Sequence, residues 1–183
     1  MATFFTSDIH FSDERIMKLC SRPFSSTQEM DEYIIEKWNR KVSKTDTVWV
    51  LGDIVSPEHF NTELLNKLNG KIYLVLGNHD YPVRDKIVSE SKIKICAENS
   101  IYQDGDMVMC HYPIMDWNDR DKGTIHLYGH VHNKEILGMK EYFSDKLAFN
   151  VCMDVNDFEP KTLEELIVAE GKKEFFERIR RTN

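Results

Sequence analysis

Histidine, aspartate and asparagine side chains gather where short apolar segments of this chain end. Five such segments lead directly into residues that can bind a metal ion, and they are 2–7, 48–51, 72–76, 107–110 and 124–128. The residues that follow them are Asp8, His10, Asp53, Asn78, His79, His111, His130 and His132. Short apolar runs rich in Val, Ile, Phe and Tyr are typical of buried strands. Because ligands bind beyond the carboxyl ends of the strands in open α/β sheets, we expect these side chains to meet at one rim.

Four of these residues form two pairs with one residue between the partners. Asp8 and His10 make the first pair, and His130 and His132 make the second. In an extended segment, side chains two residues apart point to the same face, so each pair can offer two ligands to one site. A glycine lies shortly before several of the ligands, where a strand can turn sharply because no Cβ is in the way. These glycines are Gly52, Gly77 and Gly129.

The donor types predict a site for two metal ions. Carboxylate, imidazole and amide donors suit Mn²⁺, Fe²⁺, Zn²⁺ or Ni²⁺, and the absence of thiolate ligands argues against a structural zinc site. Even the seven of these residues other than His79 are too many for one ion that keeps an open position, but they suit two ions ~3.5–4 Å apart that share a bridging carboxylate. Any single histidine would be interpreted more readily as a hydrogen-bonded structural residue. Five of the seven histidines lie at strand ends, however, and this clustering favours the metal site.

The bulk composition is that of an ordinary globular protein. The 183 residues carry 41% hydrophobic and 30% charged residues, and we expect a single domain over residues 1–183. The net charge of −7 argues against a general nucleic-acid binder, so no stable nucleic-acid complex is expected. Neither a signal peptide nor a membrane span is apparent. Four cysteines without a CxxC pair are typical of reduced thiols, and we expect a cytoplasmic location.

The first half of the chain alternates strand-like and helix-like segments. Helices are predicted over residues 12–21, over about 30–42 behind the capping-box spacing of Ser26 and Glu29, over 58–68, and over 80–91 with Pro82 near the start. Alternation of this kind implies parallel strands joined by helical crossovers.

The second half is richer in strands. Strand-like runs cover 93–97, 100–103, 107–110, 124–128 and 147–152, and Gln103-Asp104-Gly105-Asp106 predicts a hairpin turn. Thr162 and Glu165 have capping-box spacing, and a last helix could dock through Phe175, Phe176 and Ile179. Two sheets packed face to face with helices outside would accommodate both halves.

The ordered motifs resemble those of the calcineurin-like metallophosphoesterases. They are Asp8-x-His10, Gly52-Asp53, Gly77-Asn78-His79-Asp80, the strand-terminal His111 and Gly129-His130-x-His132. The segments Ser21-Arg22-Pro23-Phe24 and His111-Tyr112-Pro113 are similar to those of the small single-domain bacterial and phage members. The resemblance spans residues 8–132. It implies an α/β fold, a four-layer α/β/β/α sandwich of two mixed sheets, with a dinuclear site at its rim.

The same resemblance implies an assignment of the ligands. The first metal would be held by Asp8, His10, Asp53 and His132. The second would be held by Asp53, Asn78, His111 and His130, with Asp53 bridging. The two ionised carboxylates face roughly four positive charges, and this surplus favours a bridging hydroxide and an anionic phosphate oxygen. We expect hydroxide to attack phosphorus in line, without a covalent enzyme intermediate.

His79 is expected to give the leaving alkoxide its proton, because the resembling family places this histidine beside the metals without using it as a primary ligand. Proton donation of this kind is worth about 10²–10⁴ in rate. The alternative is that His79 only positions the phosphate. Asp80 could orient His79 or cap the following helix, and the sequence does not separate these roles.

Arg22 is the candidate phosphate-binding cation, together with Asn78 and His79 on the substrate side. The protein Ser/Thr phosphatases continue their Gly-Asp motif into an Asp-Arg pair, whereas this chain continues Gly52-Asp53 with Ile-Val-Ser-Pro. Arg22 could replace the missing arginine, since arginine binds phosphate bidentately. It could equally anchor its own loop to a backbone carbonyl.

Several further residues near the motifs have open roles. Tyr112, Trp117 and Arg120 could line the entrance to the site, although packing is favoured for Trp117. Asp154 follows another apolar run, and we interpret it as a turn residue rather than a calcium ligand. His126 could support a metal ligand or lie on the strand surface, and the sequence does not decide.

The most consistent function is a metal-dependent phosphoric ester hydrolase. We expect a phosphodiesterase or phosphomonoesterase that acts on small or nucleotide-like substrates with two divalent ions, manganese among the candidates. A phosphoprotein phosphatase is an alternative that the missing Asp-Arg pair disfavours. A non-catalytic interaction scaffold with this fold is another, but it predicts missing ligands, whereas every ligand position is filled here.

Overall fold

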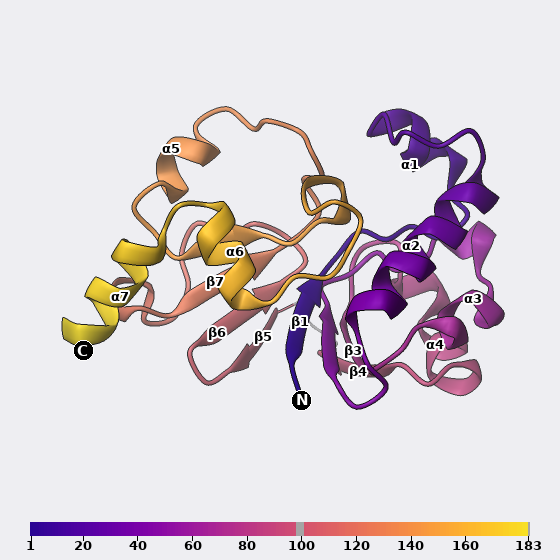
Figure 1. Cartoon of the computed structure of the whole chain (residues 1–183), viewed down its shortest axis with the longest axis horizontal. Coiled ribbons are helices and arrows are strands. Elements are labelled where there is room, and N and C mark those ends of the chain that lie inside the picture. The colour runs from indigo at the N-terminus through magenta and orange to yellow at the C-terminus, as the bar shows by residue number, and fades with distance from the viewer. Residues whose placement is uncertain (98–100, 183) are drawn as a thin grey trace.

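The computed structural model describes residues 1–97 and 101–182 (Figure 1). The first half forms a sheet whose strands lie in chain order, and they are β1 (Thr3–Thr6), β2 (Thr47–Val50), β3 (Lys71–Val75) and β4 (Lys94–Ala97). All pairings in this sheet are parallel, as the alternation of strands and helices predicted. The expectation of mixed pairing in both sheets is therefore wrong for this one, because a helical segment separates each pair of consecutive strands.

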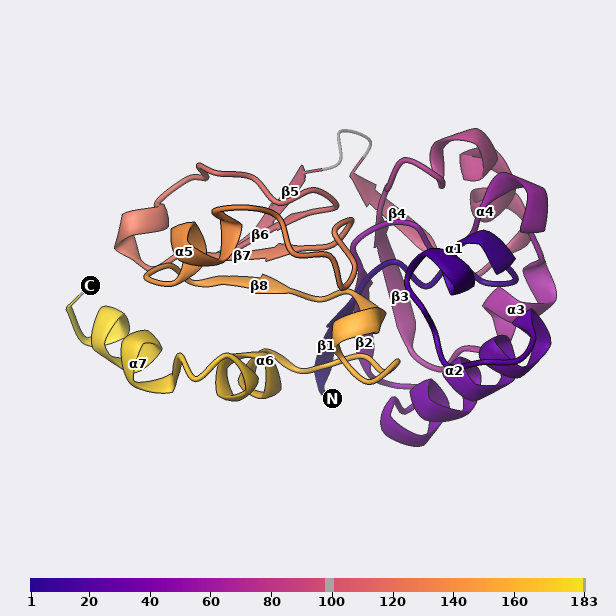
Figure 2. The same cartoon turned by 90° about the horizontal axis from the view of Figure 1, so that it is seen from above.

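Helices cover the outer face of the parallel sheet (Figure 2). They are α1 (Glu14–Leu19), α2 (Thr27–Lys41), α3 (Thr62–Lys67) and α4 (Arg84–Glu90), with 3-10 turns at Pro57–His59 and Tyr81–Val83. Met30, Ile34 and Trp38 recur at helical spacing along α2, and none of their surface is exposed. They belong to the same core cluster as Val50 and Leu74 on the facing side of the sheet.

The capping of α2 is confirmed only in part, and the helix predicted from residue 58 begins later. The hydroxyl of Ser26 accepts the backbone N–H of Glu29, but the Glu29 carboxylate accepts from Ser25, so the capping box is incomplete. The helix predicted from residue 58 begins instead at Thr62, where Asn61 caps it. Pro57 lies in a separate 3-10 turn before this helix. The side chains at these starts find their bonding partners locally, and sequence spacing alone does not fix which partner is chosen.

The second half forms a mixed sheet. Its strands, also in chain order, are β5 (Ile101–Asp104), β6 (Met107–Cys110), β7 (Ile125–Tyr128) and β8 (Ala148–Asn150). The hairpin between β5 and β6 is antiparallel and turns at Gly105-Asp106 as predicted, whereas the remaining pairs are parallel. The strand predicted over 100–103 has its first residue outside the described part of the chain.

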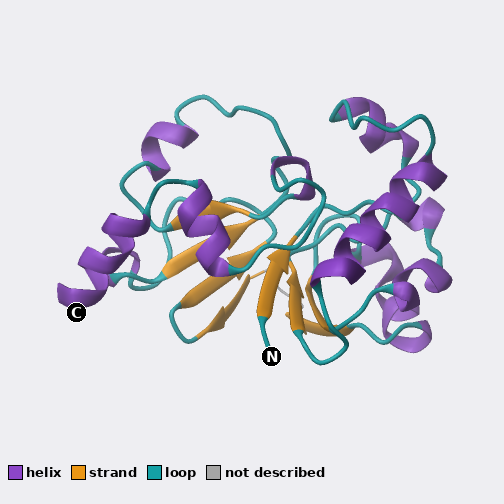
Figure 3. Cartoon of the chain, in the orientation of Figure 1, coloured by secondary structure: helices purple, strands orange, loops and turns teal. Residues whose placement is uncertain are grey.

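The two sheets pack against each other and carry helices on their outer faces (Figure 3). Phe5 and Trp49 of the first sheet share a buried cluster with Leu127 and Phe149 of the second. The remaining elements are α5 (Met139–Phe143), α6 (Leu163–Ala169), α7 (Lys173–Thr182) and 3-10 turns at Arg120–Lys122 and Met153–Val155. The four-layer α/β/β/α architecture is thus confirmed. Thr162 and Glu165 form the predicted capping box, while the side chain of Ile179 lies outside the described residues.

The ends of β1 and β8 meet at the seam between the two sheets. The backbone N–H of Ser7 donates to the carbonyl of Val151 at 3.1 Å, and that of Met153 donates to the carbonyl of Ser7 at 3.2 Å. The carboxyl ends of the parallel strands in both sheets therefore open toward one shared rim. Within the described residues, no helix is both long and apolar enough to cross a membrane.

His126 belongs to the core rather than to the rim. Its Nδ1–H donates to the carbonyl of Val108 at 3.1 Å, and its Nε2 accepts the backbone N–H of Ile114 at 3.1 Å. Burial lowers its pKa to about 4, which keeps the ring neutral. Both roles considered for this histidine are therefore replaced by a structural one, since its two hydrogen bonds hold the loop after β6 against the sheet.

Candidate metal centre

Loops that leave the carboxyl ends of five strands supply the candidate ligands. Asp8 and His10 follow β1, and Asp53 follows β2. The other side chains follow β3, β6 and β7 and are Asn78, His79, His111, His130 and His132. Both sheets thus contribute to one rim, which explains how residues so distant in the sequence come together.

The side chains form two clusters that meet at Asp53. In the first, ligand atoms of Asp8, His10 and His132 lie within 4.8 Å of one another. In the second, atoms of Asp53, His111 and His130 lie within the same distance. The Oδ2 atom of Asp53 is 3.6 Å from Nε2 of His10 and 3.4 Å from Nε2 of His111. This carboxylate therefore stands between the clusters, in the place expected of a bridging ligand.

Asn78 joins the second cluster from the solvent side. Its Oδ1 atom lies 3.1 Å from Nε2 of His111 and accepts the hydroxyl of Tyr112 at 3.3 Å. The structure thus brings all seven candidate metal ligands together, and their assignment to two ions stays a prediction. Tyr112 also lies at this rim, since its ring is 4.5 Å from that of His130.

Buried polar atoms without partners show that the donor set suits a cation. Among the described residues, Asp8 Oδ1 and both ring nitrogens of His10 are buried and lack a hydrogen bond. Buried polar groups in folded proteins are nearly always satisfied. Nε2 of His10 faces the carboxylate of Asp53 and Oδ1 of Asp8 faces the imidazole of His132, each at 3.6 Å, and divalent ions held by such mixed donors would satisfy these two atoms.

The backbone at the candidate ligands is strained in a consistent way. Five of them have φ in the left-handed region, with 56° at Asp8, 51° at His10, 55° at Asp53, 70° at His130 and 51° at His132. This conformation costs an L-residue about 1–2 kcal/mol. The paired ligands do not meet through the two-residue alternation of an extended strand, as the spacing suggested, but because sharp local turns aim each side chain inward.

Two glycines allow the backbone loops to approach the ligands closely. A Cβ on Gly77 would lie 2.2 Å from Oδ1 of Asp53, and a Cβ on Gly52 would lie 2.4 Å from Nδ1 of His111. Gly52 also has φ of +90°, which side chains rarely tolerate. At Gly77 the need is for space, because its φ is not positive.

Neighbouring charged groups shift the pKa values of Asp53 and His111. Burial alone would raise the pKa of Asp53, but its interactions with His111 and His10 lower it to about 2. Burial would lower the pKa of His111, but its bond to Asp53 and the charge of Asp8 raise it to about 9. Nδ1–H of His111 donates to the carbonyl of Leu51 at 2.8 Å. That bond directs Nε2 of the same ring toward the cluster.

The role of Asp80 differs from both predicted ones. Its buried carboxylate accepts three backbone N–H groups, from Asp53 at 2.7 Å, Gly77 at 2.8 Å and Ile54 at 3.0 Å. It does not cap the helical turn that follows, and no bond joins it to His79 in the described structure. Burial, together with the charge of Asp53, raises its pKa to about 7. Asp80 therefore ties the loop after β2 to the loop after β3 and holds Asp53 in place.

The guanidinium of Arg22 is fully engaged inside the protein. Its Nε and Nη2 donate to the carboxylate of Asp154 at 2.8 and 3.0 Å, and further bonds reach the carbonyls of Ile9 at 2.8 Å and Asp8 at 2.7 Å. Nη1, which donates to Ile9, also contacts the sulfur of Met30 at 3.4 Å. These bonds correspond to the anchoring role considered for Arg22. They occupy every N–H that a phosphate clamp would need.

Asp154 is the functional residue that sequence reasoning missed. It follows β8 and was interpreted as a turn residue, but its Oδ2 lies 2.7 Å from Nδ1 of His132. Burial opposes ionisation of Asp154, yet its bonds to His132 and Arg22 lower its pKa to about 2. The carboxylate thus orients His132 toward the first cluster, as carboxylates do for metal-binding histidines. The only local signal was its position just beyond the end of a strand.

The remaining candidates divide between the rim and the core. His79 is half-buried, its ring lies edge-on to that of His10 at 5.1 Å, and its backbone N–H donates to Asp53 Oδ1 at 2.9 Å. Trp117 is packed, as favoured, with its indole N–H bound to the carbonyl of Thr124 at 3.0 Å. Arg120 pairs with Asp121 away from the metal ligands. Only Tyr112 of the three proposed entrance residues therefore contacts the cluster.

The cysteines remain free thiols, as predicted. Two of them lie beside candidate ligands: atoms of Cys20 are within 4.8 Å of His132 and Asp154, and the thiol of Cys152 donates to Oδ2 of Asp8 at 2.8 Å. For Cys152 the surroundings set the charge. Burial and the neighbouring Asp8 carboxylate raise its pKa well above the ordinary value, so the group is a neutral donor. It holds one oxygen of Asp8 while the other faces His132.

A cavity of about 250 Å³ opens onto the clusters. Asp53, His79 and His130 are among the residues that line it, together with Leu19 and Lys134. An ester group can therefore approach the candidate ligands from solvent.

Comparison with other proteins agrees with this geometry. The protein MJ1445 of Methanocaldococcus jannaschii is 28% identical over 172 residues, which cover 91% of this chain and 90% of that protein. The gene 66 protein of Mycobacterium phage L5 is 27% identical over 165 residues, covering 74% of this chain and 79% of its own length. A solved structure of the Aquifex aeolicus protein AQ665, described as of unknown function, superposes with a TM-score of 0.69. At 23% identity, covering 91% of this chain and 98% of that one, its likeness concerns the fold.

The family comparison covers the strands and loops that carry the candidate ligands. The model of the calcineurin-like phosphoesterases matches residues 1–151, which include both sheets and every candidate metal ligand. The chain therefore belongs to the calcineurin-like phosphoesterase family.

Proposed function

We propose that this protein is a phosphoric ester hydrolase that works with two divalent metal ions on small or nucleotide-like phosphodiesters or phosphomonoesters. The observation that carries the proposal is the pair of ligand clusters with Asp53 between them, together with buried donor atoms that have no hydrogen-bond partner in the described structure. Membership of a family of phosphoesterases supports the same chemistry.

The donor set divides naturally between two ions. Asp8, His10, Asp53 and His132 would hold the first. Asp53, Asn78, His111 and His130 would hold the second. When bound, the ions would act as Lewis acids and supply a hydroxide nucleophile for in-line attack on phosphorus. Asp154, Asp80 and Cys152 would keep the donors in place, through the contacts to His132, the Asp53 backbone and Asp8.

His79 is the residue best placed to handle the leaving group. It lines the cavity, and no hydrogen bond to another described residue engages its ring nitrogens. Its backbone is fixed by the bond to Asp53, while the ring stands against His10. We infer that it donates a proton to the departing alkoxide. Asn78 and Tyr112, which are hydrogen-bonded to each other, would face the oxygen atoms of the ester from the opposite side of the cluster.

Replacement of His79 by alanine should slow esters of poorly acidic alcohols more than esters of 4-nitrophenol. A poor leaving group needs a proton, and general-acid help is worth about 10²–10⁴ in rate. The measurement is kcat for a series of aryl and alkyl phosphodiesters, plotted against the pKa of the leaving alcohol. A steeper dependence in the variant would support proton donation. Equal losses across the series would instead assign His79 to phosphate positioning.

The engagement of Arg22 favours small substrates over phosphoproteins. The phosphatases that act on proteins place an Asp-Arg pair after Gly-Asp, which this chain lacks, and the arginine considered as a substitute is buried in other bonds. The alternative of a non-catalytic scaffold does not explain why all candidate ligands are present and converge.

The decisive experiment is metal removal followed by resupply. The chain stripped by a chelator should not hydrolyse 4-nitrophenyl phosphate or bis(4-nitrophenyl) phosphate, and Mn²⁺, Ni²⁺, Zn²⁺ or Fe²⁺ should restore turnover of at least one of them. The preferred ester then identifies the mono- or diesterase. Absence of turnover with every metal, in protein that binds two ions per chain, would favour the scaffold alternative.

A further inference from the structure

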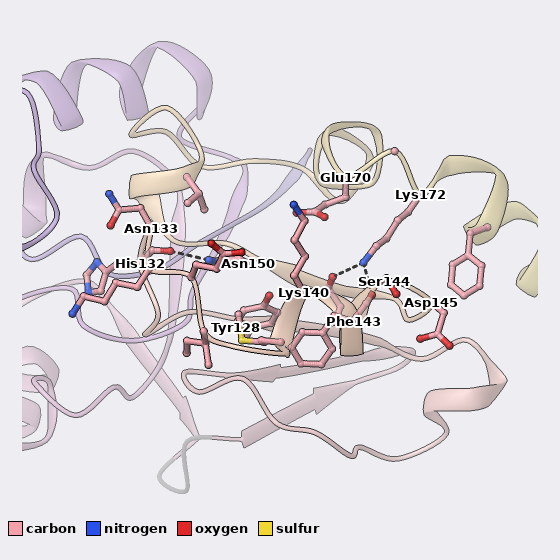
Figure 4. A pocket seen from close by; sticks show the side chains of 18 of the residues that line it. Tyr128, His132, Asn133, Lys140, Phe143, Ser144, Asp145, Asn150, Glu170 and Lys172 are labelled. Carbon is pink, nitrogen blue, oxygen red and sulfur yellow. Dashed lines mark hydrogen bonds between the residues drawn. The ribbon is translucent and has the colours of Figure 1, made fainter.

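A second and larger cavity, shown in Figure 4, shares lining residues with the metal cavity. It has a volume of about 840 Å³ and lies over β7 and β8, beside α5 and the segment that joins α6 to α7. His132, Lys134 and Ile136 line both cavities. The segment after β7 that carries the metal ligands therefore forms a border common to the two spaces.

The sizes of the two cavities suggest that they bind different parts of a substrate. Ligand pockets usually measure about 300–1,000 Å³. The metal cavity, at about 250 Å³, is below this range, while the second cavity, at about 840 Å³, is well inside it. The metal cavity thus has room for a phosphate group and part of what is attached to it, while the second cavity offers the larger space. An organic group attached to that phosphate would extend into the second cavity.

The base of the second cavity is aromatic with a polar group. The rings of Tyr128 and Phe143 lie 5.4 Å apart, and both residues are buried. Figure 4 shows them together beneath the pocket. No hydrogen bond joins the Tyr128 hydroxyl to another described residue. This surface offers apolar contact and one hydrogen-bonding hydroxyl, which suits a flat ring that carries polar atoms.

Charged residues surround the cavity in different states of engagement. Lys172 is buried, and its ammonium donates to the carbonyls of Phe143 at 2.9 Å, Lys146 at 3.0 Å and Ala148 at 3.2 Å. It is part of the wall. Lys134, by contrast, is exposed at the border with the metal cavity, and its ammonium has no ion pair with any other described residue. It is therefore the cation available to an anionic group that lies between the two cavities.

We propose that the second cavity binds the nucleoside part of a nucleotide phosphodiester whose phosphate lies at the metal cluster. Tyr128 would contact the base or sugar through its hydroxyl, and Lys134 would pair with a phosphate oxygen at the border. The inference rests on the proposed function, which it deepens by naming the substrate class and the residues that select it.

Binding of a nucleotide product tests this assignment without turnover. The Mn²⁺-loaded protein is titrated with thymidine 5′-monophosphate and with methyl phosphate, which has no nucleoside, by calorimetry. Tyr128→Phe should weaken thymidine 5′-monophosphate about fivefold through the lost hydrogen bond. Lys134→Met should weaken it by about the same factor. The matched control is Lys71→Met, an exposed lysine at the opposite, N-terminal end of β3.

Kinetics then separates this inference from the proposed function. We expect Tyr128→Phe to lower kcat/KM for 4-nitrophenyl thymidine 5′-phosphate more than for methyl 4-nitrophenyl phosphate. Equal losses on both esters, or nucleotide binding unchanged in both variants, would overturn the role of the second cavity while the hydrolase stands. If the wild-type protein hydrolyses neither ester with any metal, the proposed function fails, and the titration alone decides whether the cavity holds a nucleoside.

Discussion

Asp53→Asn should lower kcat/KM by about a thousandfold or more while the fold survives. Asp53 is the one carboxylate that lies between both clusters, 3.6 Å from His10 and 3.4 Å from His111. The amide has nearly the same size, and its oxygen can still accept the N–H of His79. It lacks the negative charge that a ligand shared by two cations must provide, and the two ions supply most of the charge stabilisation in this chemistry.

Two measurements accompany the kinetics of this variant. Metal content should fall from two ions per chain to one or fewer, and circular dichroism should keep its wild-type shape. Asp104→Asn, which removes an exposed carboxylate from β5, serves as the matched control and should retain full activity. Turnover close to wild type in Asp53→Asn would remove this residue from the bridging role and with it the dinuclear interpretation.

Asp154→Ala should cost both stability and metal affinity. The Asp154 carboxylate pairs with Arg22 where the side chains are 1% and 0% exposed, and loss of one partner from a buried pair costs about 3–5 kcal/mol. For a chain of this length, that corresponds to a fall in Tm of about 10 °C. His132 also loses the acceptor at 2.7 Å that orients it, and loss of such a partner typically weakens metal binding about 10–100-fold.

Asp154→Asn helps to distinguish the loss of stability from the loss of metal affinity. The amide has one acceptor oxygen in place of two, so it cannot replace the carboxylate toward both Arg22 and His132. Thermal melts of the metal-free protein report on the pair with Arg22, and competition with a chelating dye reports on His132. Asp121→Ala is the control, since Asp121 pairs with Arg120 at the surface and its loss should leave Tm unchanged. An Asp154→Ala protein as stable as the wild type would contradict the stabilising role of the buried pair.

The candidate ligands could be predicted because the rule that places them is short-ranged. Each follows an apolar run by a few residues, and the carboxyl ends of parallel strands share one edge of a sheet. Asp8, Asp53 and His111 are found at such ends in the structure. Helix α2 could also be predicted, since Met30, Ile34 and Trp38 repeat at the spacing of one buried face.

The supporting residues could not be predicted because their partners are far away in the sequence. Arg22 and Asp154 are 132 residues apart, and neither carries a local signal that names the other. Asp80 has a neighbour, His79, that suggested a partnership, but its oxygens accept backbone N–H groups from a different loop. Roles of this kind depend on how loops pack, which periodicity and spacing do not encode.

His126 is a residue whose role the sequence left open. It could support a metal ligand or lie on the strand surface. The ring instead points into the core under α5, where two backbone groups satisfy both nitrogens. Strand alternation fixes which face a side chain occupies, but it does not reveal which face is turned toward the ions.

The left-handed backbone at five candidate ligands limits the free energy of unfolding that this protein can reach. These residues are Asp8, His10, Asp53, His130 and His132. Glycine would adopt these torsions without strain, yet it has no donor atom to offer a cation. At these five positions, a residue that would raise stability would therefore lower metal affinity, and selection for the two properties is opposed. The backbone strain is present before any ion binds, so that under the proposed function the donor atoms would already be gathered when the ions arrive.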